Sequence, residues 1–577
     1  MKQNIRLFHQ VSSLWEKFLD WNPQLFREIK GKLKTRNVVA AAAISSITQF
    51  VAVICLLGDL PDPDPQGILG VQYGRYGMGN IYEDLGSYHY RHLPYTKDLL
   101  DNWVINWQLL WLDLFMILSI ISIFALLVVG TYMLIADTVK EESRGTLNFI
   151  RLTPQSASSI SLGKIFGVPI LLYIVILLFL PLHLIAGLGA RIPLTLILGF
   201  DVVIVASCAF FYSLALLWSL MDFGLSSFKP WLGSGVIATL LLVFTKNLFN
   251  SGYLTLDNPL GCLFLFNPSL VLSYLIDATY LPDNKIDFLP AKNLGELLFY
   301  GQALWTKASL GIGLIIFNFS LWTYWCWSIL KRRFHNPEHT LFSKVQSYWL
   351  TAWLVAIALG FTLQSTVEND LTEYFMFSQF CLYVWGLGLI ASLSPHRQAL
   401  HDWARYRHQI NQSNNALWKE LIFGENSPST VAVAINLVIA IAYITPSIFL
   451  LLGFDKQFVF WGFMLSAGSI TLCAIAAQFI LTAKTRKRAA WSVITVASMI
   501  IVPPVCFGLA KIYPQTIPQA WLFSFIPTVA TEYATTSAIL VTMLGQWLAV
   551  ALIGLQMTRK LKQAGASETK MLLSQSR

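Results

Sequence analysis

The chain has 577 residues, of which 55% are hydrophobic and only 12% charged, and its formal net charge is +9. Soluble domains carry about 25% charged residues, so this composition, with a mean hydropathy of +0.58, excludes an ordinary soluble protein. The positive charge does not call for a nucleic-acid partner, because it is explained by basic residues that orient membrane spans and contact anionic lipid.

Twelve apolar segments are long enough to cross the hydrocarbon core of a bilayer. They lie at 37–57, 109–136, 165–187, 194–220, 231–249, 308–330, 348–365, 374–393, 430–453, 457–482, 489–510 and 536–557. The sequence therefore predicts an all-α polytopic membrane protein with about twelve transmembrane helices, arranged as two halves of six spans each, and an interfacial helix before the first span.

Lys and Arg are distributed unevenly between the two sides of these spans. About three quarters of the 40 basic residues fall in the N-terminal segment, the C-terminal segment and the connections on the same side as both. Basic residues accumulate on the cytoplasmic side of membrane proteins, so we expect both termini to be cytoplasmic. The seven cysteines include no CxxC pair, which argues against a disulfide framework or a cysteine metal site.

The N-terminal 36 residues end in a predicted amphipathic helix. Asn22 is a good N-cap and Pro23 suits the first helical position. Apolar residues recur every fourth position at Leu25, Ile29 and Leu33. Such a helix is expected to lie in the membrane interface and to lead into the first span. A soluble helix without a membrane role is the alternative.

The first external connection, 58–106, is rich in Gly, Pro, Tyr and acidic residues. His89 and His92, with Glu83 and Asp84 nearby, could hold a soft metal ion, but such clusters are more often solvated loop residues. We therefore expect no metal site. Asp113 lies near the outer end of the second span and can reach the interface.

The segment after the second span carries the most specific pattern. A charged helix leaves the membrane through Glu141 and Glu142, the chain turns at Thr153-Pro154, and a second helix returns through Gly163-Lys164. Thr153 is the expected N-cap of the returning helix, with Pro154 in its first turn. We predict a charged helical hairpin that projects into the cytoplasm and suits the docking of a partner.

This hairpin resembles that of the ABC-2 type permeases, the membrane subunits of ATP-binding-cassette exporters. The matching residues are an acidic pair, Gly-Thr-Leu, a later Pro and a Gly-Lys, at Glu141, Glu142, Gly145, Thr146, Leu147, Pro154, Gly163 and Lys164. The N-terminal pattern Asn22, Pro23, Arg27 and Glu28 is similar to the elbow helix of the same family, especially its copies linked by name to multicopper-enzyme maturation.

The resemblance covers residues 20–335 and implies a domain order and a partner. It implies an interfacial helix at 1–36, a permease half at 37–335 with the coupling hairpin 137–164, a diverged second half at 336–558 and a cytoplasmic tail at 559–577. A separate ATP-binding-cassette subunit would bind ATP and Mg²⁺ and dock on the hairpin at Glu141, Glu142, Gly145, Thr146, Pro154, Gly163 and Lys164. The implied function is an exporter permease in the bacterial inner membrane.

This chain is not predicted to bind ATP or to be an enzyme. Gly163-Lys164 lacks the earlier glycine and the following Ser or Thr of a phosphate loop, since Ser158 and Ile165 stand there. His335-Asn336-Pro337-Glu338-His339 fits a zinc-protease pattern, but Pro337 would break the helix that the ligands need. No cofactor is therefore expected in this chain.

Two further features concern the remaining spans. His183 and Asp201 lie in antiparallel spans at similar depth, so a structural His–Asp contact, or part of a translocation path, is expected. The stretch 259–276 in the second external connection, 250–307, is interrupted by Asn267-Pro268, which favours a re-entrant or interfacial hairpin. Its residues Leu263–Ser269 resemble Leu522–Thr528 before the last span, and a duplication or chance similarity explains this equally well.

Two other functions stay open. One is a membrane-embedded transferase acting on lipid-linked substrates, and the other is an accessory membrane protein without transport activity. The sequence also leaves open whether one chain supplies both permease halves or two chains pair as a homodimer.

Overall fold

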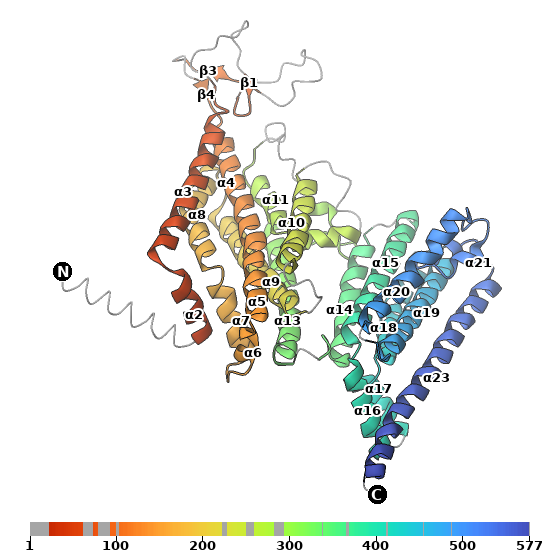
Figure 1. Ribbon diagram of the computed structural model, residues 1–577. Coiled ribbons are helices and arrows are strands. Elements are labelled where there is room, and N and C mark those ends of the chain that lie inside the picture. The colour runs from red at the N-terminus through yellow and green to blue at the C-terminus, as the bar shows by residue number, and fades with distance from the viewer. Residues whose placement is uncertain are drawn as a thin grey trace. The chain divides into compact units, whose positions relative to one another are not determined.

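The computed structural model describes residues 22–61, 73–78, 93–99, 103–221, 228–249, 259–281, 294–336, 339–364, 368–410, 414–453, 455–485 and 487–575. The ribbon in Figure 1 is almost entirely helical. The predicted cluster His89, His92, Glu83 and Asp84 lies outside the described residues, as do Pro337 and Glu338 of the His335–His339 pattern.

Within the described residues, twelve helices are long and apolar enough to cross a membrane. They are Thr35–Leu57, Trp107–Ser143, Ile170–Gly189, Leu194–Ser219, Lys229–Leu248, Ala308–Phe334, Lys344–Thr362, Asp370–Leu393, Thr430–Leu451, Lys456–Leu481, Arg488–Leu509 and Thr536–Ala564. The prediction of an all-α polytopic membrane protein with twelve spans is confirmed.

The chain forms two compact units, and each contains six of these spans. Unit 1 consists of Met1–Leu256, Gly261–Leu297 and Leu304–His335. Unit 2 consists of Asp257–Leu260, Leu298–Ala303 and Asn336–Arg577.

Unit 1 begins with a short helix outside the spans and contains a helical hairpin between its second and third spans. Its helices are α2 (Pro23–Lys32), α3 (Thr35–Leu57), α4 (Trp107–Phe124), α5 (Gly130–Ser143), α6 (Thr146–Arg151), α7 (Ala157–Gly167), α8 (Ile170–Gly189), α9 (Leu194–Ser219), α10 (Lys229–Leu248), α11 (Leu272–Asp277) and α13 (Ala308–His335). Three short 3₁₀ segments are Pro259–Phe266, whose first two residues belong to unit 2, Pro268–Val271 and Leu294–Glu296.

The second span is one helix with an internal π-helical turn. The turn, Ala125–Val129, joins α4 to α5. A π turn frees a backbone carbonyl from its usual partner, and the Tyr212 hydroxyl donates to the Leu126 carbonyl at 2.9 Å. Gly130 lies directly under the Tyr212 ring, where a Cβ atom would clash. The Tyr212 ring thus occupies the space beside Gly130, and its hydroxyl provides a donor for a carbonyl of the irregular turn.

The described part of the first long connection contains two small antiparallel ribbons that the sequence did not predict. They pair β1 (Tyr73–Gly74) with β2 (Leu93–Pro94) and β3 (Thr96–Lys97) with β4 (Trp103–Val104). The Arg75 guanidinium binds both Asp113 carboxylate oxygens, at 2.5 and 2.7 Å, and the Tyr76 hydroxyl donates to the same carboxylate at 3.1 Å. Burial, followed by the Asp113 charge, raises the pKa of Tyr76 far above its usual range, so the phenol stays a donor.

The interrupted stretch before α13 is a sharply bent helical pair. Pro259–Phe266 and Pro268–Asp277 meet at 95°. Asn267 caps the second segment and donates to Thr245 at 2.9 Å, while Ser269 bonds Thr245 at 3.1 Å. The polar side chains at the bend therefore find hydrogen-bond partners inside unit 1. Irregular backbone at membrane depth is tolerated only where it is buried in protein in this way. The predicted break at Asn267-Pro268 is present.

Unit 2 holds six spans, two helices outside them, and two short helical turns before the last span. Its helices are α14 (Lys344–Thr362), α15 (Glu368–Leu393), α16 (Arg397–Ile410), α17 (Asn414–Phe423), α18 (Thr430–Leu451), α19 (Lys456–Leu481), α20 (Arg488–Leu509), α21 (Pro518–Trp521), α22 (Thr528–Thr531) and α23 (Thr536–Gln575).

The core of unit 2 surrounds α19, which packs against α15, α18, α20 and α23. Buried Phe375, Leu437 and Phe463 belong to this core. Gln379 links several polar groups within it: its amide donates to the Gly462 carbonyl at 2.8 Å and to Ser466 at 2.7 Å, and it accepts from Thr528 at 2.5 Å. Paired side chains of this kind hold membrane helices together.

Candidate functional site: the elbow helix and the hairpin

The elbow helix α2 begins at a side chain that also binds another helix. Asn22 Oδ1 accepts from the Leu25 amide at 3.1 Å, and Pro23 occupies the first helical position. The other end of the same amide, Nδ2, donates to the Ser159 carbonyl of α7 at 2.6 Å. Asn22 is therefore both the predicted N-cap and a link from α2 to α7.

Two glycines on one face of α7 let α2 approach closely. A Cβ atom at Gly163 would lie 2.9 Å from Asn22 Oδ1, Gln24 Cβ and the Leu25 amide nitrogen. A Cβ atom at Gly167 would lie 2.5 Å from Glu28 Cβ. Small residues four apart allow membrane helices to pack backbone to backbone. The buried face of α2 is formed by Gln24, Leu25 and Glu28, whereas Leu33 is exposed.

A charge network lies where α2, α5 and α7 meet, formed by Arg27, Glu28, Lys32, Asp137, Glu141 and Lys164. Lys164 is its most buried member, with 2% of its surface exposed. Its ammonium lies 2.7 Å from Asp137 Oδ2 and 2.6 Å from Glu141 Oε2. The first contact is a hydrogen bond, and the second is an ion pair. A buried ammonium needs such partners to offset its desolvation.

On the α2 side of the network, Arg27 and Lys32 contact two glutamates. Arg27 binds Glu141 and also contacts Glu28 at 3.2 Å, and Lys32 binds Glu28 at 3.0 Å. Lys32 also donates to the Val168 carbonyl at 3.1 Å. Burial lowers the pKa of Arg27, but the Glu141 and Glu28 carboxylates outweigh it and raise the pKa overall.

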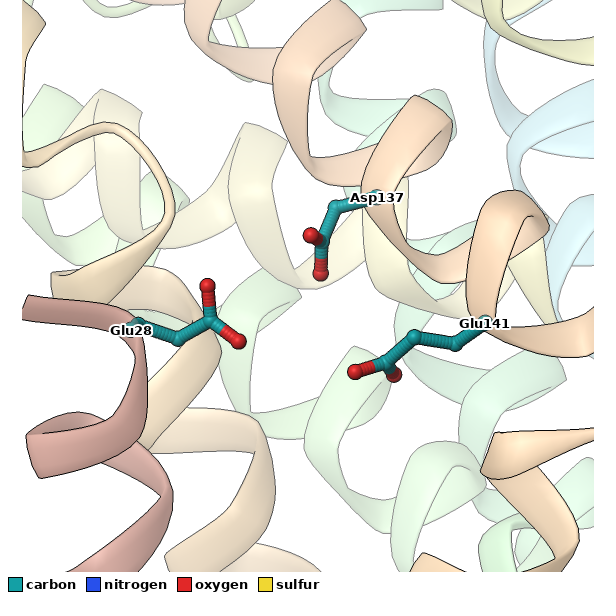
Figure 2. Close-up of side chains that lie close together, drawn as sticks. All are labelled: Glu28, Asp137 and Glu141. Atoms are coloured by element: carbon teal, nitrogen blue, oxygen red, sulfur yellow. The ribbon is translucent and has the colours of Figure 1, made fainter. Parts of the chain in front are cut away.

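Figure 2 shows the carboxylates of Glu28, Asp137 and Glu141 turned toward one another from α2 and α5. One oxygen of each lies within 4.8 Å of the others, a spacing that suits a metal ion. However, the Lys164 ammonium already contacts Asp137 and Glu141, and Arg27 and Lys32 contact Glu28. Three carboxylates meet three cations, so the network is neutral without a metal.

The hairpin contains an additional short helix that the sequence did not predict. After α5, the chain turns at Gly145, forms α6, turns again and enters α7. The Thr146 hydroxyl donates to the Glu141 carbonyl at 3.1 Å and closes the first turn.

The expected cap of the returning helix was wrong. Ser156 caps α7 by accepting from the Ser159 amide at 3.1 Å. The Thr153 hydroxyl instead donates to the Ile150 carbonyl at 2.7 Å, which ends α6. Pro154 therefore lies in the turn before α7 rather than in the first turn of a helix, and it is exposed.

Gly145 has φ +71, and a Cβ atom added there would meet no atom within 4 Å, so only its backbone conformation requires glycine. We expect Gly145→Ala to destabilise the α5–α6 turn by about 1 kcal/mol, and Gly145→Asn by less, because asparagine adopts the left-handed region more readily. Hydrogen exchange of the α6 amides checks this. Equal protection in the glycine, asparagine and alanine proteins would contradict it.

The tip of the hairpin exposes large apolar side chains. Leu147 and Ile150 of α6 are buried against a core that includes Leu134 and Phe334. Phe149 and Leu152 point away from it and are 75% and 84% exposed. Glu142, Thr146 and Pro154 are exposed on the same segment.

Comparison of the chain with protein-family models, with curated proteins and with solved structures finds no match. The resemblance to ABC-2 permeases thus rests on the motif residues themselves and stays a prediction.

The motif residues separate into two groups in the structure. Gly163 and Lys164 are buried beneath α2, and Glu141 is bound within the charge network together with Arg27 and Glu28. The prediction that Gly163 and Lys164 form a docking surface is therefore wrong, because neither residue is accessible at the surface of unit 1. The exposed group is Glu142, Thr146 and Pro154, beside the half-buried Gly145.

The structure does not bring His183 and Asp201 together as bonding partners. His183 Nε2 lies 2.9 Å from the Ser119 hydroxyl, and the imidazole stacks on Phe115 with ring centroids 4.3 Å apart. Within the described residues, no hydrogen bond or ion pair joins His183 to Asp201. The reason is that His183 faces α4, on which α8 packs closely through Gly187 and Gly189.

Sequence reasoning missed Asp137, Lys32 and Gly167 as members of this site. Each stands four residues from a residue that was singled out: Glu141, Glu28 and Gly163 respectively. Residues four apart lie on one helix face. That spacing was the signal that could have identified them.

Proposed function

We propose that this chain is the membrane-spanning permease of an ATP-driven transporter, energised by a separate ATP-binding-cassette subunit. ATP and Mg²⁺ would bind to that partner. The proposal puts the hairpin and both termini in the cytoplasm, the spans in the bacterial inner membrane, and the direction of transport outward. The direction and the membrane rest on the motif resemblance and on the distribution of basic residues.

The observation that carries the proposal is the hairpin tip. Phe149 and Leu152 are exposed at a helix end outside the spans, beside the acidic Glu142. Neighbouring exposed apolar side chains that form a patch are typical of sites of protein or membrane contact. A short helix with an apolar exposed edge and a buried opposite edge suits insertion into a groove of a partner.

The charge network gives a route from this tip to the spans. α5 is the end of the second span, and α7 leads through Val168-Pro169 into α8, the third span. Lys164 ties α7 to α5, and Arg27 ties α2 to α5. A push on α6 would therefore move the ends of the second and third spans and the elbow helix together.

We expect the double variant Phe149→Ser and Leu152→Ser to lose at least about ten-fold of the co-purifying ATPase, since two central apolar contacts of an interface commonly carry that much affinity. Both side chains are exposed, so thermal stability should stay within about 0.5 kcal/mol. The measurement is a mild-detergent pull-down of the tagged chain with a vanadate-sensitive ATPase assay.

Tyr280→Ser provides the matched control. Tyr280 is 93% exposed and follows α11, near the start of α4, at the end of unit 1 away from the hairpin. This variant should retain the ATPase. Wild-type protein that purifies without any P-loop ATPase would overturn the proposal, and equal recovery from the double variant would remove the docking role of the tip.

A further inference from the structure

Unit 2 contains a cavity of about 940 Å³ that the proposed function does not use. Its walls come from α16, α17, α18, α19 and α23, all within unit 2. The volume is at the upper end of the range for small-molecule sites. We propose that this cavity binds an anionic membrane phospholipid, with the headgroup at its basic end and an acyl chain along its apolar wall.

The two ends of the cavity differ in chemistry. The apolar wall includes Val431, Ile475, Trp547 and Val550, which belong to three membrane spans. The opposite end is formed by Arg407 and His408 of α16, which is not a span, and by Lys562 near the end of the last span. An apolar wall with a basic mouth matches an amphiphile whose headgroup carries negative charge.

The depth of the cavity matches one leaflet of a bilayer. Its lining runs along α23 from Trp547 to Lys562 and along α18 from Thr430 inward. At about 1.5 Å per residue, the α23 stretch is roughly 20 Å long. One leaflet of a bilayer, with its headgroup region, is about 20 Å thick. A cavity that begins at the membrane surface and ends near the middle of the bilayer suits an acyl chain better than a free water-soluble anion.

The basic end is held in place by neighbouring side chains. Arg407 Nη1 donates to Glu420 Oε2 at 3.1 Å, and the Trp403 indole donates to the same oxygen at 2.9 Å. The Arg407 guanidinium also lies 5.8 Å from the Trp403 ring. A guanidinium has five N–H donors, so these contacts orient it and leave capacity for a phosphate.

Lys562 supplies the second charge at the mouth. Its side chain is exposed at the cavity lining. α16 is fixed beside it because Leu400 and Ala404 pack against Met557 and Leu561 of α23. Basic pockets between membrane helices at the bilayer surface bind acidic lipid headgroups.

The test uses the full chain, purified in detergent and washed free of lipid. Native mass spectrometry measures the binding of phosphatidylglycerol and of phosphatidylcholine. We expect phosphatidylglycerol to bind more tightly than phosphatidylcholine. Lys562→Gln should lower the affinity for phosphatidylglycerol about five-fold, which is the effect of one basic residue at a lipid surface. Ala434→Trp, which fills the wall, should abolish binding of both lipids.

Arg559→Gln is the matched control, because Arg559 is an exposed base on the same helix that does not line the cavity. It should bind phosphatidylglycerol like the wild type. Equal affinity for the two lipids, an equal effect of Arg559→Gln and Lys562→Gln, or displacement of lipid by millimolar inorganic phosphate would each overturn the proposal. Because the two charge variants lie at exposed positions, the result does not depend on the folding of Ala434→Trp.

Discussion

Lys164→Met is expected to destabilise the junction of α2, α5 and α7 by about 3 kcal/mol, because removal of the lysine leaves the partly buried Asp137 carboxylate unpaired. Lys164 is 2% exposed and contacts both Asp137 and Glu141. Arg27 still binds Glu141 in the variant, so the main effect is that Asp137 loses its ion pair with Lys164. Thermal unfolding in mild detergent and hydrogen exchange of α2 measure the loss, and any stimulation of a bound ATPase should disappear with it.

Two further variants distinguish the loss of the Lys164 ion pairs from the loss of any one positive charge. Lys140→Met removes an exposed lysine from the same helix α5, and its stability should stay within about 0.5 kcal/mol of the wild type. Adding Asp137→Asn to Lys164→Met removes the unpaired charge, leaves Arg27 bound to Glu141 and should recover most of the loss. Equal stability of the Lys164→Met and Lys140→Met proteins would refute a structural role for the network.

Gly163→Leu is expected to separate α2 from α7. The new side chain would begin 2.9 Å from the Leu25 amide nitrogen, which is backbone and cannot move without the helix. Overpacking of this kind costs about 1–3 kcal/mol, and the Asn22 bond to Ser159 would be strained with it. Limited trypsin digestion measures the result, since cleavage after Arg27 and Lys30 should become faster.

Gly235→Leu is the control for this substitution. Gly235 lies in α10, and nothing stands within 4 Å of a Cβ atom there. Replacement of a helical glycine in open space should be neutral or stabilise by up to about 1 kcal/mol. Trypsin protection of α2 that is the same in both variants would contradict close packing of α2 on α7.

The spans could be predicted because their signal is local. A run of about twenty apolar residues identifies a membrane helix without knowledge of its neighbours. All twelve predicted spans are present, but several bounds differ: the second and last helices run on to Ser143 and Ala564, and the third begins at Ile170 because Val168-Pro169 separates it from α7. The N-cap Asn22 is equally local, since it depends only on the residues that follow it.

The candidate site could be predicted only in part because its contacts are distant in sequence. Arg27 and Glu141 are 114 residues apart, and Asn22 and Ser159 are 137 apart. The motifs singled out many of these residues, but no local pattern indicates that Lys164 faces Asp137 or that Gly163 lies under Leu25. As a result, residues expected to contact a partner proved to be buried between helices.

The sequence offers two possible N-caps for α7. Both Thr153-Pro154 and Ser156 can begin a helix by their residue types. The short helix α6 decides between them, because Thr153 is used to end it through the Ile150 carbonyl. Since α6 is only six residues long, it has no periodicity that the sequence could reveal.

The most direct test of the proposed function is photo-crosslinking from the hairpin tip in native membranes. A photoreactive amino acid in place of Leu152, which is 84% exposed, reports whatever lies against α6. We expect a crosslink to an ATP-binding-cassette ATPase from this position, and no crosslink to that ATPase from the same amino acid in place of Tyr280. A tip that crosslinks only to lipid, or to a protein without an ATPase domain, would contradict it.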